Sequence, residues 1–253
     1  MHPPRDRVAP PRRGLLFLEG RALLELAALV PAYPWLRRAP AGDGHPVLVL
    51  PGFMASDFST RTLRGFLREL GYRTHGWKLG RNLGPSERTI QGIGERFFAL
   101  RERYGRTVSL IGWSLGGIYA RELARRFPAD VRQVITLASP FRDVEAVNVP
   151  RFLRERSRRR SIPEQETIRA GLGDPLEVPA TAIYSRSDGI AAWQSCLEPQ
   201  GPQSENIEVV SSHIGIGHHP IALLAIADRL AQPEGKWKPF TAPAGWRWPW
   251  APR

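Results

Sequence analysis

Residues 107–127 restrict the fold more than any other part of the sequence, because an apolar run passes directly into a helical pattern. The run TVSLI (107–111) has the length and the β-branched character of a buried strand, and LGGIYARELARRF (115–127) has the apolar spacing of a helix. Between them, GWSLGG places Ser114 on the connecting turn. A strand that leads straight into a helix is typical of domains with a parallel sheet.

The same alternation of apolar runs and helical patterns continues along most of the chain. Helices are expected at 59–72, beginning at a Ser N-cap, at 86–105 and at 220–232, and further strands at 46–53, 73–79, 131–140, 180–189 and 206–213. We therefore expect an α/β fold with a mostly parallel central sheet and helices on both faces, as a single domain over residues 46–232. In such sheets, functional residues gather at the carboxyl ends of the strands.

Three regions depart from this pattern. Residues 141–175 contain several Pro and Gly and the basic cluster RERSRRR (154–160), and we expect a small cap insertion there. Residues 233–253 form a Pro- and Trp-rich tail without regular structure, whose tryptophans are expected to hold it against the domain. Residues 1–45 are expected to form an amphipathic helix and a linker, with the leucines either on the protein core or at a membrane interface.

Composition limits the partners. Lys and Arg number 36 against 24 Asp and Glu, giving a net charge of +12, which favours anionic partners. The basic residues are scattered and no nucleic-acid motif appears, so nucleic acid is not expected. Cys196 is the single cysteine, which excludes an internal disulfide and a Cys-type zinc site. The leucine-rich start is too short and too charged to span a bilayer, and we predict a cytoplasmic protein without a cofactor. The sequence carries no indication of oligomeric state.

Ser114 is the candidate nucleophile. A Gly-x-Ser-x-Gly pattern between a buried strand and a helix is the context of a nucleophile elbow, and Gly112 and Gly116 allow the neighbouring chain to pass closely. A serine hydroxyl needs a base that takes its proton and donors for the oxyanion that forms on the substrate. We assign these donors to the backbone N–H groups of Leu115 and of Phe53, the latter in the loop LPGFM.

The acid and the base should follow the serine in the sequence. Asp188 follows the strand at 180–184 at the correct end of the sheet and is the preferred acid. Asp143, after another strand, remains an alternative, whereas Asp174 precedes its strand.

Three histidines lie in SSHIGIGHHP (211–220). His213 comes in the first turn beyond a strand and is the preferred base. His218 and His219, beside the proline that starts the last helix, are alternatives, and their simpler role is to cap that helix or line the site. The spacing matches no recognisable metal site.

Together these residues resemble the α/β-hydrolase superfamily over about residues 46–232, and within it bacterial lipase and esterase-type hydrolases. The elbow GWSLGG, the loop LPGFM, Asp188 and His213 occupy the motif positions of that superfamily, although its lipases commonly begin the loop with His-Gly. The stretch SSHIGIGHHP is also similar to the catalytic-histidine segment of polyhydroxyalkanoate synthases, which have a cysteine where this chain has Ser114.

The resemblance implies a serine hydrolase that cleaves carboxylic esters through an acyl-serine intermediate, with a small-molecule or lipid ester as substrate. Peripheral contact with an anionic membrane surface is compatible with the charge. Two alternatives stay open at this point: an acyltransferase that uses the same triad, and a non-catalytic protein that binds a lipid or an anionic surface.

Overall fold

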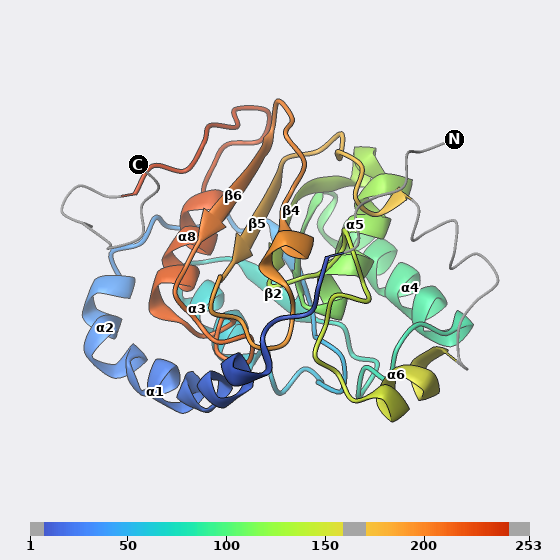
Figure 1. Ribbon diagram of the computed structural model, residues 1–253. Helices are drawn as coiled ribbons and strands as arrows, with labels where there is room; N and C mark the ends of the chain where they lie inside the picture. The colour runs from blue at the N-terminus through green and yellow to red at the C-terminus, as the bar shows by residue number, and fades with distance from the viewer. Residues whose placement is uncertain (1–7, 159–170, 243–253) are drawn as a thin grey trace.

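A six-stranded parallel sheet forms the centre of the computed structural model, which describes residues 8–158 and 171–242 (Figure 1). The strands follow the order β2-β1-β3-β4-β5-β6, and every neighbouring pair is parallel. Their bounds are β1 Pro46–Leu50, β2 Arg73–Gly76, β3 Val108–Trp113, β4 Val131–Leu137, β5 Ala180–Tyr184 and β6 Ser204–Glu208. All six overlap the predicted strands, although β6 begins two residues before the predicted range 206–213 and ends well before its end.

Helices connect the strands and precede the first one. They are η1 Arg13–Arg21, α1 Ala22–Ala27, α2 Leu29–Leu36, α3 Arg61–Glu69, α4 Glu87–Tyr104, α5 Leu115–Arg126, η2 Pro128–Asp130, α6 Arg151–Arg158, η3 Trp193–Cys196 and α8 Pro220–Leu230. The expected Ser N-cap of α3 was wrong: Thr60 is the cap residue, and the Ser59 hydroxyl donates to the carbonyl oxygen of Ser56.

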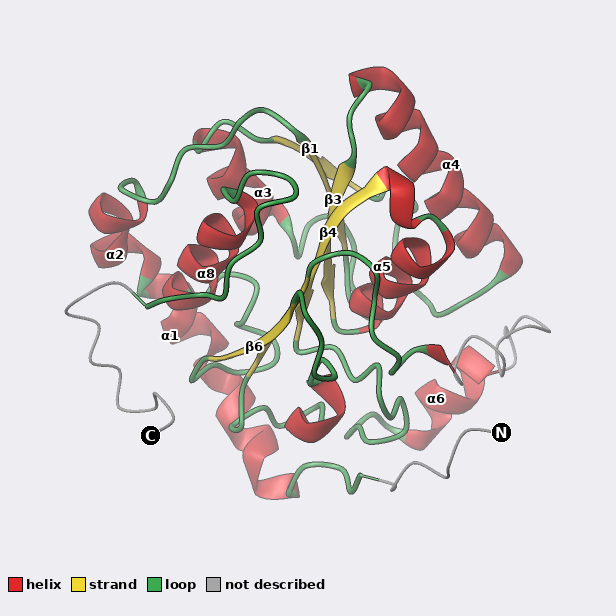
Figure 2. Ribbon diagram, turned by 90° about the horizontal axis from the view of Figure 1, so that it is seen from above, coloured by secondary structure: helices red, strands yellow, loops and turns green. Residues whose placement is uncertain are grey.

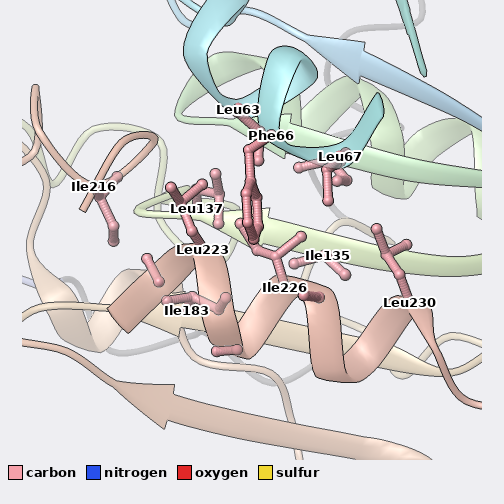
Figure 3. Packing of buried hydrophobic residues seen from close by; sticks show 14 of the residues in the cluster. Leu63, Phe66, Leu67, Ile135, Leu137, Ile183, Ile216, Leu223, Ile226 and Leu230 are labelled. Atoms are coloured by element: carbon pink, nitrogen blue, oxygen red, sulfur yellow. The ribbon is translucent and has the colours of Figure 1, made fainter. Parts of the chain in front are cut away.

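The alternation of side chains along each strand builds two cores, one on each face of the sheet. Val47 and Val49 of β1 pack in the core that α3 and α8 cover, whereas Leu48 and Leu50 pack in the core that α4 and α5 cover. Figure 2 shows these two helical layers on opposite sides of the strands, and Figure 3 shows how Phe66 of α3 and residues of α8 interleave over the sheet. The predicted α/β architecture is confirmed.

The connection between the strands creates a switch point beside β1. The chain passes from β1 outward to β2 and then returns to β3 on the other side of β1. The crevice at the carboxyl ends of two such strands is where ligands bind in open α/β sheets. Ser114 directly follows β3, and the loop at 51–54 directly follows β1.

The predicted cap and the C-terminal tail are each described only in part. Helix α6 lies between β4 and β5, inside the predicted cap. Residues 159–160 of the basic cluster and the tail beyond 242, with Trp246, Trp248 and Trp250, lie outside the described residues. The domain boundaries stay a prediction.

Residues 13–36, here called the N-terminal segment, form three successive helical pieces. Of the two places considered for the leucines, the core takes only those of α2, where Leu29 and Leu36 pack against it. In η1 and α1 the buried side chains are instead Glu19, Ala22 and Glu25. The reason is that this part of the segment covers polar loops rather than an apolar face of the sheet. Across residues 8–158 and 171–242, no helix has the length and apolar character that a membrane span requires.

Candidate active site

Ser114 has a strained backbone at the junction of β3 and α5. Its φ of 52° and ψ of −120° fall in a region that residues with a side chain rarely adopt and that often marks functional sites. Three hydrogen bonds hold this conformation: its N–H donates to Leu137 O (2.8 Å), and its carbonyl oxygen accepts from Ser139 Oγ (2.7 Å) and from Gly117 N (3.0 Å). The serine therefore projects from a fixed turn.

Glycines make this turn possible. A Cβ atom on Gly112 would overlap Gly117 Cα, and one on Gly116 would overlap the carbonyl oxygen of Leu50 at the end of β1. The close approach expected at these two positions is therefore present. Because these two residues lack a Cβ atom, the start of α5 packs directly against the neighbouring strand. Ser114 therefore lies next to the loop that follows β1.

That loop lies beside the serine. A Cβ atom on Gly52 would be 3.2 Å from Ser114 Cβ and 3.8 Å from Ser114 Oγ. The fully buried Asn82 holds the loop, because its Nδ2 donates to Pro51 O (2.9 Å) and its carbonyl oxygen accepts from Met54 N (2.7 Å). Phe53 lies between Pro51 and Met54, the two residues that these bonds hold.

The backbone N–H groups of Phe53 and Leu115 point to an anion site. Neither group has a hydrogen-bond acceptor within residues 8–158 and 171–242. Buried or partly buried N–H groups are almost always paired, so the unpaired N–H groups of Leu115, directly after Ser114, and of Phe53, in the loop beside it, are candidate donors to an oxyanion.

Asp188 and His213, the predicted acid and base, form a hydrogen-bonded pair. His213 Nδ1 lies 2.7 Å from Asp188 Oδ2, and both side chains are buried. Asp188 is fixed by its other oxygen, which accepts from the backbone N–H groups of Ile190 (2.7 Å) and Ala191 (2.8 Å). Because an ionised carboxylate only accepts hydrogen bonds, Nδ1 carries the proton of the neutral histidine, and Nε2 is left with a free lone pair.

A tryptophan connects the histidine loop to the serine. Trp113 immediately precedes Ser114, and its Nε1 donates to the carbonyl oxygen of His213 (3.0 Å). The loop turns over the same indole ring at Gly217, where a Cβ atom would lie 2.7 Å from the ring. The loop of the base is thus packed on the end of β3.

The electrostatic surroundings favour a charged imidazole at position 213. Burial alone would lower the pKa of His213, but the charge and hydrogen bond of Asp188 and the charge of Glu19 together raise it above its usual value. A histidine in this environment takes up a proton readily when a neighbouring hydroxyl gives one up.

The alternative residues have other contacts. Asp143 accepts from the backbone N–H groups of Val8 and Glu145. His218 Nε2 is 3.0 Å from the carbonyl oxygen of Ala22, and His219 is the N-cap residue of α8 but makes no capping hydrogen bond with its side chain. No cluster of three or more His, Cys, Asp or Glu side chains suited to a metal occurs in the described part of the chain.

Comparison with solved structures identifies the architecture. The chain resembles lipase B of Aspergillus fumigatus, with 19% identity, a TM-score of 0.61, and coverage of 77% of this chain and 54% of that one. It also resembles an alpha/beta superfamily hydrolase of Oenococcus oeni PSU-1, with 16% identity, a TM-score of 0.55, and coverage of 74% and 91%. The chain has the α/β-hydrolase fold. The resemblance inferred from the motifs is confirmed at this level.

Comparison with curated sequences gives a partial match. It is 32% identical over 98 residues to the pimeloyl-[acyl-carrier protein] methyl ester esterase of Shewanella woodyi. The matched stretch is 39% of this chain and 37% of that esterase, so it spans little more than a third of either protein. No protein-family model matches the sequence.

Several residues that shape the candidate site were not found from the sequence. Asn82 and Ser139 hold the loop and the elbow, and two buried carboxylates of the N-terminal segment, Glu19 and Glu25, lie against the loops of Asp188 and His213. Asn82 precedes Leu-Gly-Pro, which indicates only a turn. The two glutamates interrupt an apolar helical pattern, and nothing local distinguishes them from solvent-exposed charges.

Proposed function

We propose that the protein is a serine hydrolase that cleaves carboxylic esters through an acyl-serine intermediate. The observation that carries this proposal is the strained Ser114 at the switch point, with the hydrogen-bonded Asp188–His213 pair packed against the end of the same strand through Trp113. Strain at an isolated serine is kept only where the surrounding structure enforces it, and such positions are common at catalytic sites.

The reaction proceeds in two steps, acylation of Ser114 and hydrolysis of the acyl-serine. In the first, His213 Nε2 takes the proton of Ser114 Oγ, the oxygen bonds to the ester carbon, and the proton passes to the departing alcohol as the C–O bond breaks. In the second, water attacks the acyl-serine, and its proton passes through His213 back to Ser114. Asp188 keeps the ring oriented and stabilises the imidazolium formed in each step.

The N–H groups of Phe53 and Leu115 receive the negative charge that develops on the carbonyl oxygen. Both N–H groups are fixed before the reaction begins, because Asn82 holds the loop of Phe53 and Leu115 is the first residue of helix α5. Preorganised donors of this kind stabilise the tetrahedral intermediate without a cost of reorganisation.

An ester is the substrate class that the comparisons favour. A lipase and a methyl ester esterase are among the proteins that the chain resembles. Esters also suit an enzyme of this type because an alkoxide leaves more easily than an amine.

A serine-reactive probe and a series of esters test the proposal. Wild-type protein should react covalently with a fluorophosphonate and should hydrolyse p-nitrophenyl esters, with the preferred acyl length found by comparing short and long chains. Ser114→Ala should abolish both, whereas the control Ser56→Ala, at a serine whose hydroxyl contacts only its own turn, should keep both. A folded wild-type protein that neither reacts with the probe nor hydrolyses any ester of the series would refute the proposal.

We also propose that the N-terminal segment brings the enzyme to an anionic lipid surface. Phe17 is 89% exposed, Leu23 76% and Val30 78%, so the outer side of the segment is apolar. Exposed arginines flank it at both ends: Arg12, Arg13, Arg37 and Arg38. An apolar face bordered by cationic side chains matches the chemistry of a membrane interface with anionic headgroups.

Vesicle sedimentation tests this surface. Wild-type protein should bind vesicles that contain phosphatidylglycerol more strongly than vesicles of phosphatidylcholine alone, and Leu23→Gln combined with Leu24→Gln should weaken binding to the anionic vesicles. Equal binding of wild type and variant would contradict the proposal. So would a wild-type dimer in solution that the same double variant converts to a monomer, because a second copy would then cover the face.

A further inference from the structure

The N-terminal segment buries its carboxylates and exposes its leucines. Glu19 is 7% exposed and Glu25 is 8% exposed, whereas Leu24, which precedes Glu25 in the sequence, is 73% exposed. Burying a carboxylate is unfavourable unless hydrogen-bond donors replace the water that it loses. The donors around these two side chains therefore show what the segment contributes.

Glu19 joins the loops of the proposed acid and base. Its Oε1 atom accepts hydrogen bonds from the backbone N–H groups of Gly189 (2.8 Å) and His213 (3.0 Å). Its Oε2 atom accepts from the N–H of Ile214 (3.0 Å). Because Gly189 follows Asp188 directly, one carboxylate binds the residue after the acid and the backbone of the base itself.

The rest of the segment strengthens this junction. Glu25 accepts from the Ser212 N–H (2.7 Å) and from the hydroxyls of Ser212 (2.6 Å) and Ser211 (3.2 Å). Arg21 forms an ion pair with Glu25 (3.2 Å) and donates to the carbonyl oxygen and hydroxyl of Ser187 (3.1 and 2.7 Å). Figure 1 shows the blue N-terminal segment beside the orange loops that follow β5 and β6.

We propose that Glu19 is a positioning residue of the active site, which fixes the Asp188 and His213 loops relative to each other and whose charge favours the imidazolium formed during the reaction. This inference rests on the proposed function, because positioning has a catalytic effect only if His213 takes up a proton. Glu19 binds backbone groups of the two loops and so acts through them rather than on the substrate.

The charge of Glu19 reaches His213, whereas that of Glu25 reaches a different histidine. The charged groups that act on His213 are Asp188, after β5, and Glu19, in the N-terminal segment. Burial alone would lower the pKa of His213, but these two carboxylates raise it above its usual value. For His219, burial lowers the pKa more than the charge of Glu25 raises it. The two glutamates therefore form a matched pair for an experiment.

The test compares Glu19→Gln with Glu25→Gln in the full chain. Its readouts are the hydrolysis of p-nitrophenyl acetate and the nuclear magnetic resonance titration of His213, whose signal is assigned by its loss in His213→Asn. Glu19→Gln should lower kcat about 10- to 100-fold by displacing the base, with KM little changed. It should also move the titration of His213 and the acidic limb of kcat/KM to lower pH. Glu25→Gln should leave the titration of His213 at its wild-type position.

Glu19→Asp separates the charge from the reach of the side chain. It keeps the carboxylate but is one methylene shorter, so it cannot span the two loops in the same way. Its kcat should fall, while the titration of His213 should stay closer to that of the wild type than in Glu19→Gln. If Glu19→Gln does not fold, kcat and the titration of His213 in Glu19→Asp test the inference instead.

A merely structural role would give a different result. Variants of Glu19 that unfold more easily but have wild-type kcat and wild-type titration of His213 when folded would overturn the inference. Failure of the proposed function is distinguishable from this outcome, because it would remove ester hydrolysis and probe labelling from the wild type. In a wild type without activity, the titration of His213 would still report whether the charge of Glu19 acts on it. An unshifted titration in Glu19→Gln would overturn the inference in that case as well.

Discussion

Gly215 leaves open the space that the carboxylate of Glu25 occupies: a Cβ atom at this glycine would overlap Glu25 Oε2 and lie 2.6 Å from Ser212 Oγ. The glycine in the histidine loop is thus required by a side chain that comes from the opposite end of the chain.

Gly215→Ala should therefore destabilise the protein. The buried Glu25 is held by three hydrogen bonds and cannot move away freely, so we expect a loss of about 1–3 kcal/mol in the free energy of unfolding, measured with urea. Gly65→Ala is the matched control, because its Cβ would meet nothing within 4 Å in α3, and it should stabilise the protein by about 0.5–1 kcal/mol. A Gly215→Ala protein at least as stable as the wild type would contradict the packing described.

Asp188→Asn should lower kcat for ester hydrolysis about 10⁴-fold, because an amide donor facing Nδ1 favours the wrong tautomer of His213. The oxygen that accepts from Ile190 and Ala191 can be kept by the asparagine, so the fold should be retained. Steady-state kinetics with circular dichroism check both points. Asp143→Asn serves as the control and should leave kcat unchanged, and the reverse ranking of the two variants would make Asp143 the acid.

Asn82→Ala should lower kcat about 10- to 100-fold, since the loop that carries Phe53 loses the bond between Asn82 Nδ2 and Pro51 O and with it the alignment of one oxyanion donor. Kinetics with a p-nitrophenyl ester measure the effect. Tyr119→Phe is a milder comparison, because it removes only a hydroxyl 3.3 Å from Asn82 Oδ1. If Asn82→Ala keeps the wild-type kcat, the loop does not depend on this side chain.

Acid should destabilise the protein through His45. This residue is fully buried, and burial is the main cause that lowers its pKa from 6.5 to about 4. A histidine with a lowered pKa contributes stability above its unfolded pKa and loses it as the pH falls towards the folded value. In His45→Asn, the dependence of the free energy of unfolding on pH between 6.5 and 4 should therefore be shallower, by at most about 1.4 kcal/mol per pH unit.

Urea unfolding at several pH values compares the two proteins. His218→Asn, which replaces a histidine that contacts the carbonyl oxygen of Ala22, is the control for the exchange of a histidine for an asparagine. Identical slopes for wild type and His45→Asn would show that His45 titrates normally in the folded protein.

The sheet and the elbow could be predicted because their causes are local in sequence. The run at 107–111 has the composition of a buried strand, and glycines on both sides of Ser114 are needed wherever a strand turns so sharply. The position of His213 followed from its distance to the preceding strand. The cap residue of α3 was misplaced by one position, because Ser59 and Thr60 are both suitable cap residues, and both hydroxyls instead donate to carbonyl oxygens of the preceding turn.

The support of the site could not be predicted for a physical reason. A glutamate in a leucine-rich helix has the same local pattern whether it faces water or a set of backbone N–H groups. What distinguishes Glu19 is the presence of Gly189, His213 and Ile214 around it, and the sequence separations are 170, 194 and 195 residues. Periodicity therefore predicted the amphipathic helix but left open which side of it faces the protein.

These long separations set an order of events during synthesis. Residues 13–36 leave the ribosome before residues 188–214, so the partners of Glu19 and Glu25 are not available when the segment emerges. Contacts so distant in sequence close slowly. A nascent chain stalled before residue 188 would accordingly lack Asp188, His213 and the backbone N–H groups that bind Glu19.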